Sequence, residues 1–177
     1  MIKSFTSSEM LGIWRRALGL ETRRRDCSVD SFEGIDSDDI LLRHIRSWYL
    51  DILDTAPAHL IPTVDIADKI SLSAADNLWG VIDLPDSVRR PISVRLDGWE
   101  NHAVVQAAEY AAPNLRNLAN RFIRPGKIAP AAVLVGRQIR VTPVDDCQAL
   151  KSLICVDDPG NDLFVLDEAL VNPSLSN

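Results

Sequence analysis

The residues that could act as acids or metal ligands do not form a recognisable catalytic pattern. Three pairs of adjacent aspartates occur, at Asp38-Asp39, Asp145-Asp146 and Asp157-Asp158. Such pairs can share a proton or bind a metal, but each of these stands at a predicted helix start or turn. Acidic side chains at such places cap backbone amides, so we assign the three pairs a structural role.

The cysteines and histidines also lack the spacing of a reactive or metal-binding site. Cys147 and Cys155 are eight positions apart, Cys27 stands alone, and no C-x-x-C pair occurs. This odd, scattered set predicts neither a disulfide framework nor a zinc site, and it favours a reducing, intracellular compartment. We expect His44 and His59 to be structural. A Cys/His nucleophile whose partners meet only in the fold stays open as an alternative.

The motifs that mark the main enzyme classes are missing from the sequence. It holds no G-x-x-x-x-G-K-[ST], no G-x-G-x-x-G, no H-E-x-x-H and no G-x-S-x-G. We therefore predict a protein that is not an enzyme and that carries no cofactor and no metal. An enzyme built from ordinary Asp, His and Arg side chains in a cleft is the alternative from that class.

Length and composition predict an ordinary globular chain. It has 177 residues, of which 46% are hydrophobic and 25% charged, enough to bury a core without disulfides or metals. We expect a single domain, 1–177, with a helical part at 1–60, a β-rich part at 61–160 and a terminal helix and tail at 161–177. No apolar stretch is long enough for a membrane span, and the start lacks the apolar core of a signal peptide, so a soluble, cytoplasmic protein is expected.

The net charge of -6 lies entirely in the last part of the chain. Residues 141–177 hold one basic and seven acidic side chains, whereas the two charges balance before them. Such a segment is either a solvated acidic edge or a surface for a basic partner. The run Arg23-Arg24-Arg25 could bind phosphates, but Glu21 and Asp26 flank it. Because the chain is acidic and only 6% aromatic, specific nucleic-acid recognition is disfavoured.

Two helices are predicted in the first 60 residues. Thr6-Ser7-Ser8-Glu9 has the form of a capping box, which predicts a helix over 7–18 that ends at Gly19. After an exposed loop at 20–35, a second helix is predicted from Asp36 to Asp54, with a broad apolar face. We expect this face to pack on the first helix, with Trp14 and Trp48 in the seam.

The following residues change to the alternating pattern of strands. A hairpin is predicted at 131–142, with Gly136-Arg137 as its two-residue turn, and Trp99 is expected to anchor a turn after Gly98. A loop covers 106–124. The remaining expected elements are strands near 70–72, 78–82, 92–96, 102–105 and 150–156 and a last short helix at 162–171. The predicted class is α+β, with amino-terminal helices packed with a small, mostly antiparallel sheet and a short carboxy-terminal helix.

One segment resembles a known family. From Trp79 to Trp99 the sequence reads WGVIDLPDSVRRPISVRLDGW, a strand, a Leu-Pro-acidic turn, a strand that alternates apolar residues with arginine, and a tryptophan. This order resembles the head-tail connector, or neck adaptor, proteins of tailed bacteriophages. Looser likeness continues through 122–126, 129–133 and 139–143. The sequence departs from the pattern at Ser87, where the family has an aromatic residue, and in its Arg-rich loop.

The resemblance implies a structural virion protein at the head-tail interface, made in the bacterial cytoplasm. It implies a homo-oligomeric ring of about a dozen copies docked on the portal protein, next to tail or neck proteins. DNA would pass through it without sequence-specific contacts, and no membrane is involved. A small bacterial regulatory or protein-interaction domain is the alternative. Trp and Arg often anchor interfaces, and the candidate interface residues are Arg23, Arg24, Arg25, Trp48, Trp79, Arg90, Arg95 and Trp99.

Overall fold

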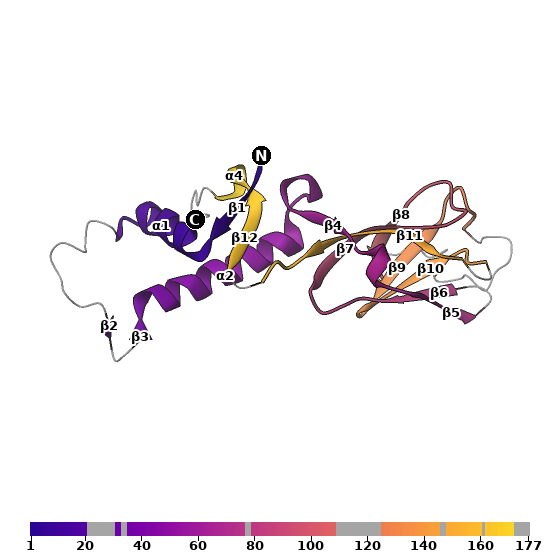
Figure 1. Ribbon diagram of the computed structural model, residues 1–177, viewed down its shortest axis with the longest axis horizontal. Coiled ribbons are helices and arrows are strands. Elements are labelled where there is room, and N and C mark those ends of the chain that lie inside the picture. Colours follow the sequence, from indigo (N-terminus) through magenta and orange to yellow (C-terminus); the bar gives the residue numbers. More distant parts are fainter. Residues whose placement is uncertain are drawn as a thin grey trace. The chain divides into compact units, whose positions relative to one another are not determined.

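The computed structural model describes residues 1–20, 31–32, 35–76, 79–108, 125–145, 148–160 and 162–171. The chain divides into two compact units (Figure 1). We call Met1–Pro62 with Asp158–Asn177 the helical unit, and Thr63–Asp157 the β unit. The predicted α+β class is confirmed, and the β unit matches the predicted β-rich part closely. Whether the two units fold as the single predicted domain stays a prediction.

The first helix of the helical unit has the predicted cap and end. α1 spans Ser7–Ala17, and its first turn is closed by the capping box. The Glu9 amide donates to Thr6 Oγ1 at 3.3 Å, and the Thr6 amide donates to the Glu9 carboxylate at 2.8 Å. The Thr6 amide and the Thr6 hydroxyl both donate to the Glu9 carboxylate, and these two bonds hold the pKa of Glu9 below its ordinary value. Gly19 has φ of 66°, the left-handed conformation expected after a helix end.

The second helix packs on the first through the predicted aromatic pair. α2 spans Ser37–Thr55, within one residue of the predicted ends, and a 3-10 turn, η2 (Ala58–Leu60), follows it. The rings of Trp14 and Trp48 meet edge to face, with centroids 5.5 Å apart. An ion pair between Arg15 and Asp38 also joins the two helices.

The predicted helix at 162–171 is wrong over its first half. Leu163–Asp167 forms a strand, β12, and only Glu168–Val171 is helical, as α4. β12 pairs antiparallel with β1 (Ile2–Thr6), with Ile2 opposite Asp167 and Thr6 opposite Leu163. Phe164 and Leu166 are buried on one face of the strand, which is the two-residue period of a half-buried strand.

Tyr49 connects α2 to β12 inside the helical unit. Its side chain is fully buried, and its ring meets that of Phe164 edge to face at 5.1 Å. The hydroxyl donates to the Val165 carbonyl at 3.2 Å and accepts from the Val165 amide at 3.0 Å. Burial raises the pKa of Tyr49, so the hydroxyl keeps its proton and can donate.

Two predicted loops lie largely outside the described residues. Within 20–35, only two-residue strands are described after position 20, β2 (Ser31–Phe32) and β3 (Ile35–Asp36), which pair antiparallel. Of the predicted loop at 106–124, residues 109–124 lie outside the described part.

In the part of the chain that the structure describes, no helix is long and apolar enough to cross a membrane.

The β unit is built on a larger sheet than predicted. Its eight strands have the order β4-β11-β7-β8-β9-β10-β6-β5, and all neighbours are antiparallel except β8 and β9. The sheet gains strand β4, and β7 begins four residues earlier than expected. The strands are β4 Thr63–Asp65, β5 Leu72–Asp76, β6 Trp79–Asp83, β7 Val88–Leu96, β8 Ala103–Ala107, β9 Ala131–Val135, β10 Gln138–Thr142 and β11 Leu150–Asp157.

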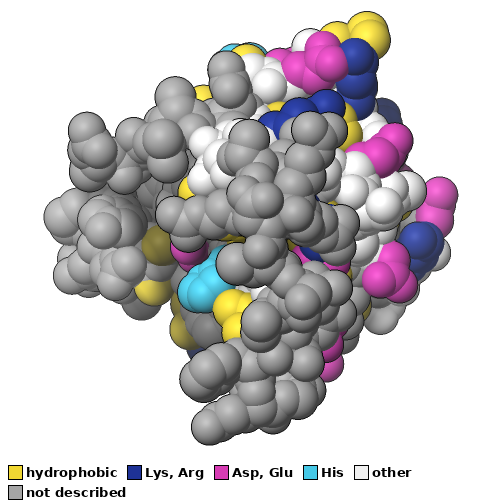
Figure 2. Space-filling view, turned by 90° about the vertical axis from the view of Figure 1, so that its left-hand side faces the viewer, with side chains coloured by type: hydrophobic (Ala, Val, Ile, Leu, Met, Phe, Trp, Pro, Cys, Tyr) yellow, Lys and Arg dark blue, Asp and Glu magenta, His cyan; other side chains and the backbone are white. Residues whose placement is uncertain are grey.

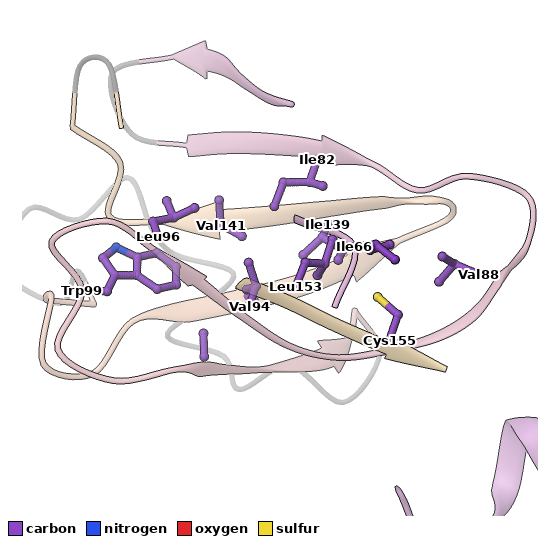
Figure 3. Packing of buried hydrophobic residues seen from close by; sticks show 12 residues of the cluster. Ile66, Ile82, Val88, Val94, Leu96, Trp99, Ile139, Val141, Leu153 and Cys155 are labelled. Carbon is purple, nitrogen blue, oxygen red and sulfur yellow. The ribbon is translucent and has the colours of Figure 1, made fainter. Parts of the chain in front are cut away.

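The curled sheet encloses one hydrophobic cluster (Figure 3). Residues from different strands converge there, among them Ile82, Val94, Ile139 and Leu153, all without exposed surface. The hairpin between β9 and β10 has the predicted turn, with Gly136 at φ of 62°. Every member of the cluster belongs to residues 63–157. The β unit therefore has a core of its own.

The two ends of the β unit lie side by side. β4 pairs with β11, with Thr63 opposite Val156 and Asp65 opposite Ile154. The Asp65 carboxylate accepts from the amides of Leu153 at 2.9 Å and Ala67 at 3.0 Å. Partial burial acts to raise the pKa of Asp65, but these hydrogen bonds outweigh it and lower the pKa. The unit is therefore an insertion whose entry and exit are joined by a short ladder.

A fragment consisting of residues 63–157 is expected to fold by itself, because its core and the pairing of its ends are internal to it. It should unfold cooperatively in urea and disperse its amide NMR signals. A matched fragment of residues 66–153 lacks β4 and the end of β11, and we expect it to be unfolded. A disordered 63–157 fragment would contradict the assignment of an independent core.

Tyr49→Phe is expected to destabilise the helical unit by about 1–3 kcal/mol, because it leaves the partly buried amide and carbonyl of Val165 without their partner. Urea unfolding of the full chain, followed by tryptophan fluorescence, measures the change. Thr55→Val is the control, since it removes an exposed hydroxyl that bonds to the Asp51 carbonyl at 2.7 Å, and we expect it to change stability by less than about 0.5 kcal/mol. Equal effects of the two substitutions would contradict the role of Tyr49.

Candidate functional site

The predicted interface residues do not form one patch. Arg23, Arg24 and Arg25 lie outside the described residues. Trp48 is half-buried on the helical unit, whereas Trp79 and Arg90 are half-buried on the β unit. They remain candidate anchors, but on two different units.

Trp99 is not an interface residue, and this prediction is wrong. Its side chain is 2% exposed and belongs to the core of the β unit (Figure 3). The indole Nε1 donates to the Pro143 carbonyl at 2.9 Å, which satisfies its only polar atom. The ring fills the end of the curled sheet, so a partner cannot reach it. Its predicted role as a turn anchor is confirmed.

Arg95 also serves the fold itself. Its guanidinium donates to the carbonyl oxygens of Trp99 at 3.2 Å and Glu100 at 3.3 Å. These bonds brace the turn that follows β7, where Gly98 has φ of 79°. The alternation of arginine with apolar residues therefore reflects a sheet with one buried face, and Arg95 reaches across its own turn.

The turn between β6 and β7 is both exposed and braced. We call Leu84–Ser87 the Leu-Pro turn. The Leu84 amide donates to the Arg137 carbonyl at 3.0 Å, and the Arg137 guanidinium bonds to the carbonyls of Pro85 and Val88. It also lies 3.5 Å from Asp86, whose carboxylate is fully exposed. The β9–β10 hairpin thus holds in place a turn that reaches into solvent.

A hollow of about 490 Å³ lies beside the Leu-Pro turn, and we call it the turn hollow. Ile66, Ile70 and Leu84 form apolar walls, and Asp83 and Asp157 contribute carboxylates. Asp83 accepts from Gln138 Nε2 at 2.8 Å. Oδ1 of Asp157 is buried and has no hydrogen-bond partner among the described residues. Such an oxygen is costly unless a donor reaches it.

A groove of about 540 Å³ runs along α2 in the helical unit. Leu42, Leu50 and Phe164 line it together with Arg46. Nη2 of Arg46 is 2.5 Å from both carboxylate oxygens of Asp158, and the guanidinium lies 5.5 Å from the centre of the Tyr49 ring. This groove therefore contains an ion pair that is already made within the chain.

The acidic carboxy-terminal part is largely matched by cations of the same chain. Asp145 pairs with Lys127 at 2.5 Å and Asp158 with Arg46 at 2.5 Å. Asp167 pairs with the amino group of Met1, and Glu168 with Lys3. Figure 2 shows one face on which basic and acidic side chains lie close together. These pairs reduce the surface charge that a basic partner would meet. Oδ1 of Asp157 has no hydrogen-bond partner within the part of the chain that the structure describes.

The described residues contain no group of three or more His, Cys, Asp or Glu side chains placed to hold a metal ion. Cys155 is buried without exposed surface, and burial, with Asp157 and Asp65 nearby, raises its pKa to about 12. A thiol in this state is a poor nucleophile. His44, His59 and His102 are exposed. Cys27 and Cys147 lie outside the described residues, so the Cys/His alternative is tested only for Cys155.

No protein-family model matches the chain, and no curated protein matches its sequence. The likeness of residues 79–99 to head-tail connectors therefore remains an interpretation of those residues. In the structure they form β6, the Leu-Pro turn, β7 and the buried Trp99.

The Cys155 thiol should be inert in the folded protein. In a Cys27→Ser/Cys147→Ser chain, we expect no reaction with a thiol-specific disulfide reagent at pH 8, because both burial and the raised pKa of Cys155 oppose attack. One thiol should react after unfolding in urea. Rapid reaction of the folded chain would contradict the buried, protonated state. A chain that also carries Cys155→Ala is the zero-thiol control.

Proposed function

We propose that this protein is a structural subunit of the head-tail connector of a tailed bacteriophage. In this role, copies form a ring that docks on the portal protein and contacts tail or neck proteins. DNA passes through the ring without specific recognition. The protein is made in the bacterial cytoplasm and becomes part of the virion.

The observation that carries the proposal is the exposed and braced Leu-Pro turn. It lies within the segment that resembles connector proteins, and Asp86 at its tip is fully exposed. Arg137 holds its backbone from the neighbouring hairpin. A surface turn that is already ordered loses less conformational entropy on binding. It is therefore suited to docking on a large, preformed partner.

The division into two units supports the same proposal. A ring needs two unlike surfaces on each copy, because the contact between neighbours is heterologous. The helical unit offers the half-buried Trp48 and the α2 groove, and the β unit offers Trp79, Arg90 and the Leu-Pro turn. The net charge of -6 also suits a channel through which DNA slides without sticking.

The genes that flank the coding sequence provide the first test. Portal, terminase or capsid genes beside it would identify the partner to use, because virion assembly genes travel together. Metabolic or regulatory neighbours without virion genes would contradict the proposal and favour the regulatory alternative.

Arg137→Ala is expected to weaken binding to the portal protein encoded nearby at least tenfold, because it removes the brace of the Leu-Pro turn. Arg140→Ala is the matched control, since Arg140 is exposed on the same hairpin and should leave binding unchanged. Co-sedimentation with portal rings measures both variants. Unchanged binding of Arg137→Ala, with its thermal unfolding unaltered, would remove the Leu-Pro turn from the portal contact.

A further inference from the structure

The turn hollow has the chemistry of a binding site for a basic side chain. Its walls, Ile66, Ile70 and Leu84, are apolar, and the carboxylates of Asp83 and Asp157 lie among them. Among the described residues that line the hollow, Lys69 is the one cation and Asp83 and Asp157 are the two acids, so these residues together have a net negative charge. Every lining residue belongs to the β unit. The site is therefore complete within that unit.

Asp157 has a carboxylate oxygen that lacks a hydrogen-bond donor among the described residues. This oxygen, Oδ1, is buried. Buried carboxylate oxygens are normally matched by donors, and a cationic donor gives the strongest bond. Asp83 already receives one bond from Gln138, and a cation that enters the hollow would lie beside Asp83 and the part of Asp157 that lines it.

Arginine fits this hollow better than a small cation does. Its guanidinium offers five donors in a planar fork, and its aliphatic stem can lie along apolar walls. The described residues provide no third carboxylate or imidazole for a metal ion. The hollow combines apolar walls with an acceptor, which matches the two parts of an arginine side chain.

We propose that the turn hollow binds the Arg23-Arg24-Arg25 segment of a second copy of this chain. This is the longest run of cations in an acidic sequence, and its charge complements the net negative hollow. One copy then supplies the arginines and the next supplies the carboxylates, a head-to-tail contact that can close into a ring. The inference rests on the proposed ring, and it assigns one of the contacts between neighbours.

Complementary variants test the contact in the full chain. The acceptor chain keeps the turn hollow but lacks the arginines, because it carries Arg23→Ala, Arg24→Ala and Arg25→Ala. The donor chain keeps the arginines but has an altered hollow, because it carries Asp83→Asn and Asp157→Asn. Each alone should stay monomeric, because each lacks one half of the contact. Their equimolar mixture should form a one-to-one dimer, which sedimentation velocity measures, and high salt should weaken it.

A second donor chain with Ser87→Arg keeps the test valid if Asp157→Asn perturbs folding. Ser87 lies exposed at the rim of the turn hollow, so an arginine there places a cation in the opening. The matched control carries Asp68→Asn and Asp97→Asn, which remove two exposed acids outside the lining. It should associate like the unmodified chain.

The outcomes separate this contact from the proposed function. Absence of a dimer in the mixture, or a dimer that survives Ser87→Arg in the acceptor chain, would overturn the assignment of the turn hollow. Portal binding by both variants would then still support the connector function. A mixed dimer without any portal binding would support the contact and count against the connector.

Discussion

The short ladder between β4 and β11 holds together the two points at which the chain enters and leaves the β unit. Thr63 and Val156 are opposite each other, although most of the β unit separates them in sequence. Asp65 strengthens the ladder because its carboxylate receives two backbone amides, and its lowered pKa keeps it ionised above acidic pH. This pairing lets a sheet of eight strands interrupt the helical unit without pulling that unit apart.

The helical unit is also stabilised by the residues that follow the β unit in the sequence, because they bind to α2. Tyr49 has both of its hydroxyl hydrogen bonds with Val165, and Asp158, the first residue after the β unit, is bound by Arg46. Asp167 and Glu168 of the carboxy-terminal part also form ion pairs in this unit, with the Met1 amino group and Lys3. The excess of acidic residues in that part of the sequence is therefore partly a sign of internal pairing, and its surface field is weaker than the residue count implies.

Local signals made much of the fold predictable. The capping box at Thr6, the glycines at 19 and 136 and the apolar face of α2 each act within a few residues, so the sequence near them determines the structure. The error at β12 has a different cause. Leu163, Leu166 and Leu170 satisfy a helical spacing, while Phe164 and Leu166 satisfy a strand spacing. The partner that decides between them, β1, lies at the other end of the sequence.

The candidate site was less predictable than the fold. Trp99 and Arg95 have the residue types of interface anchors, but tertiary contacts with Pro143 and with the turn carbonyls use them internally. The turn hollow was missed because its residues come from three separate segments, 66–71, 83–87 and Asp157, and no local pattern joins Lys69 to Asp157. The exposed acid next to Leu84-Pro85 was the signal that could have pointed to this region.

The pairing of β1 with β12 has a consequence for the order of folding during synthesis. Ile2 and its neighbours are made before the β unit, whereas their partners near Asp167 are made after it. The inserted sheet can close around its core while the chain is still growing, since domains fold as units during translation. The contacts that β1 and α2 make with β12 form only after that last strand is made, so the β unit can finish folding before the helical unit does.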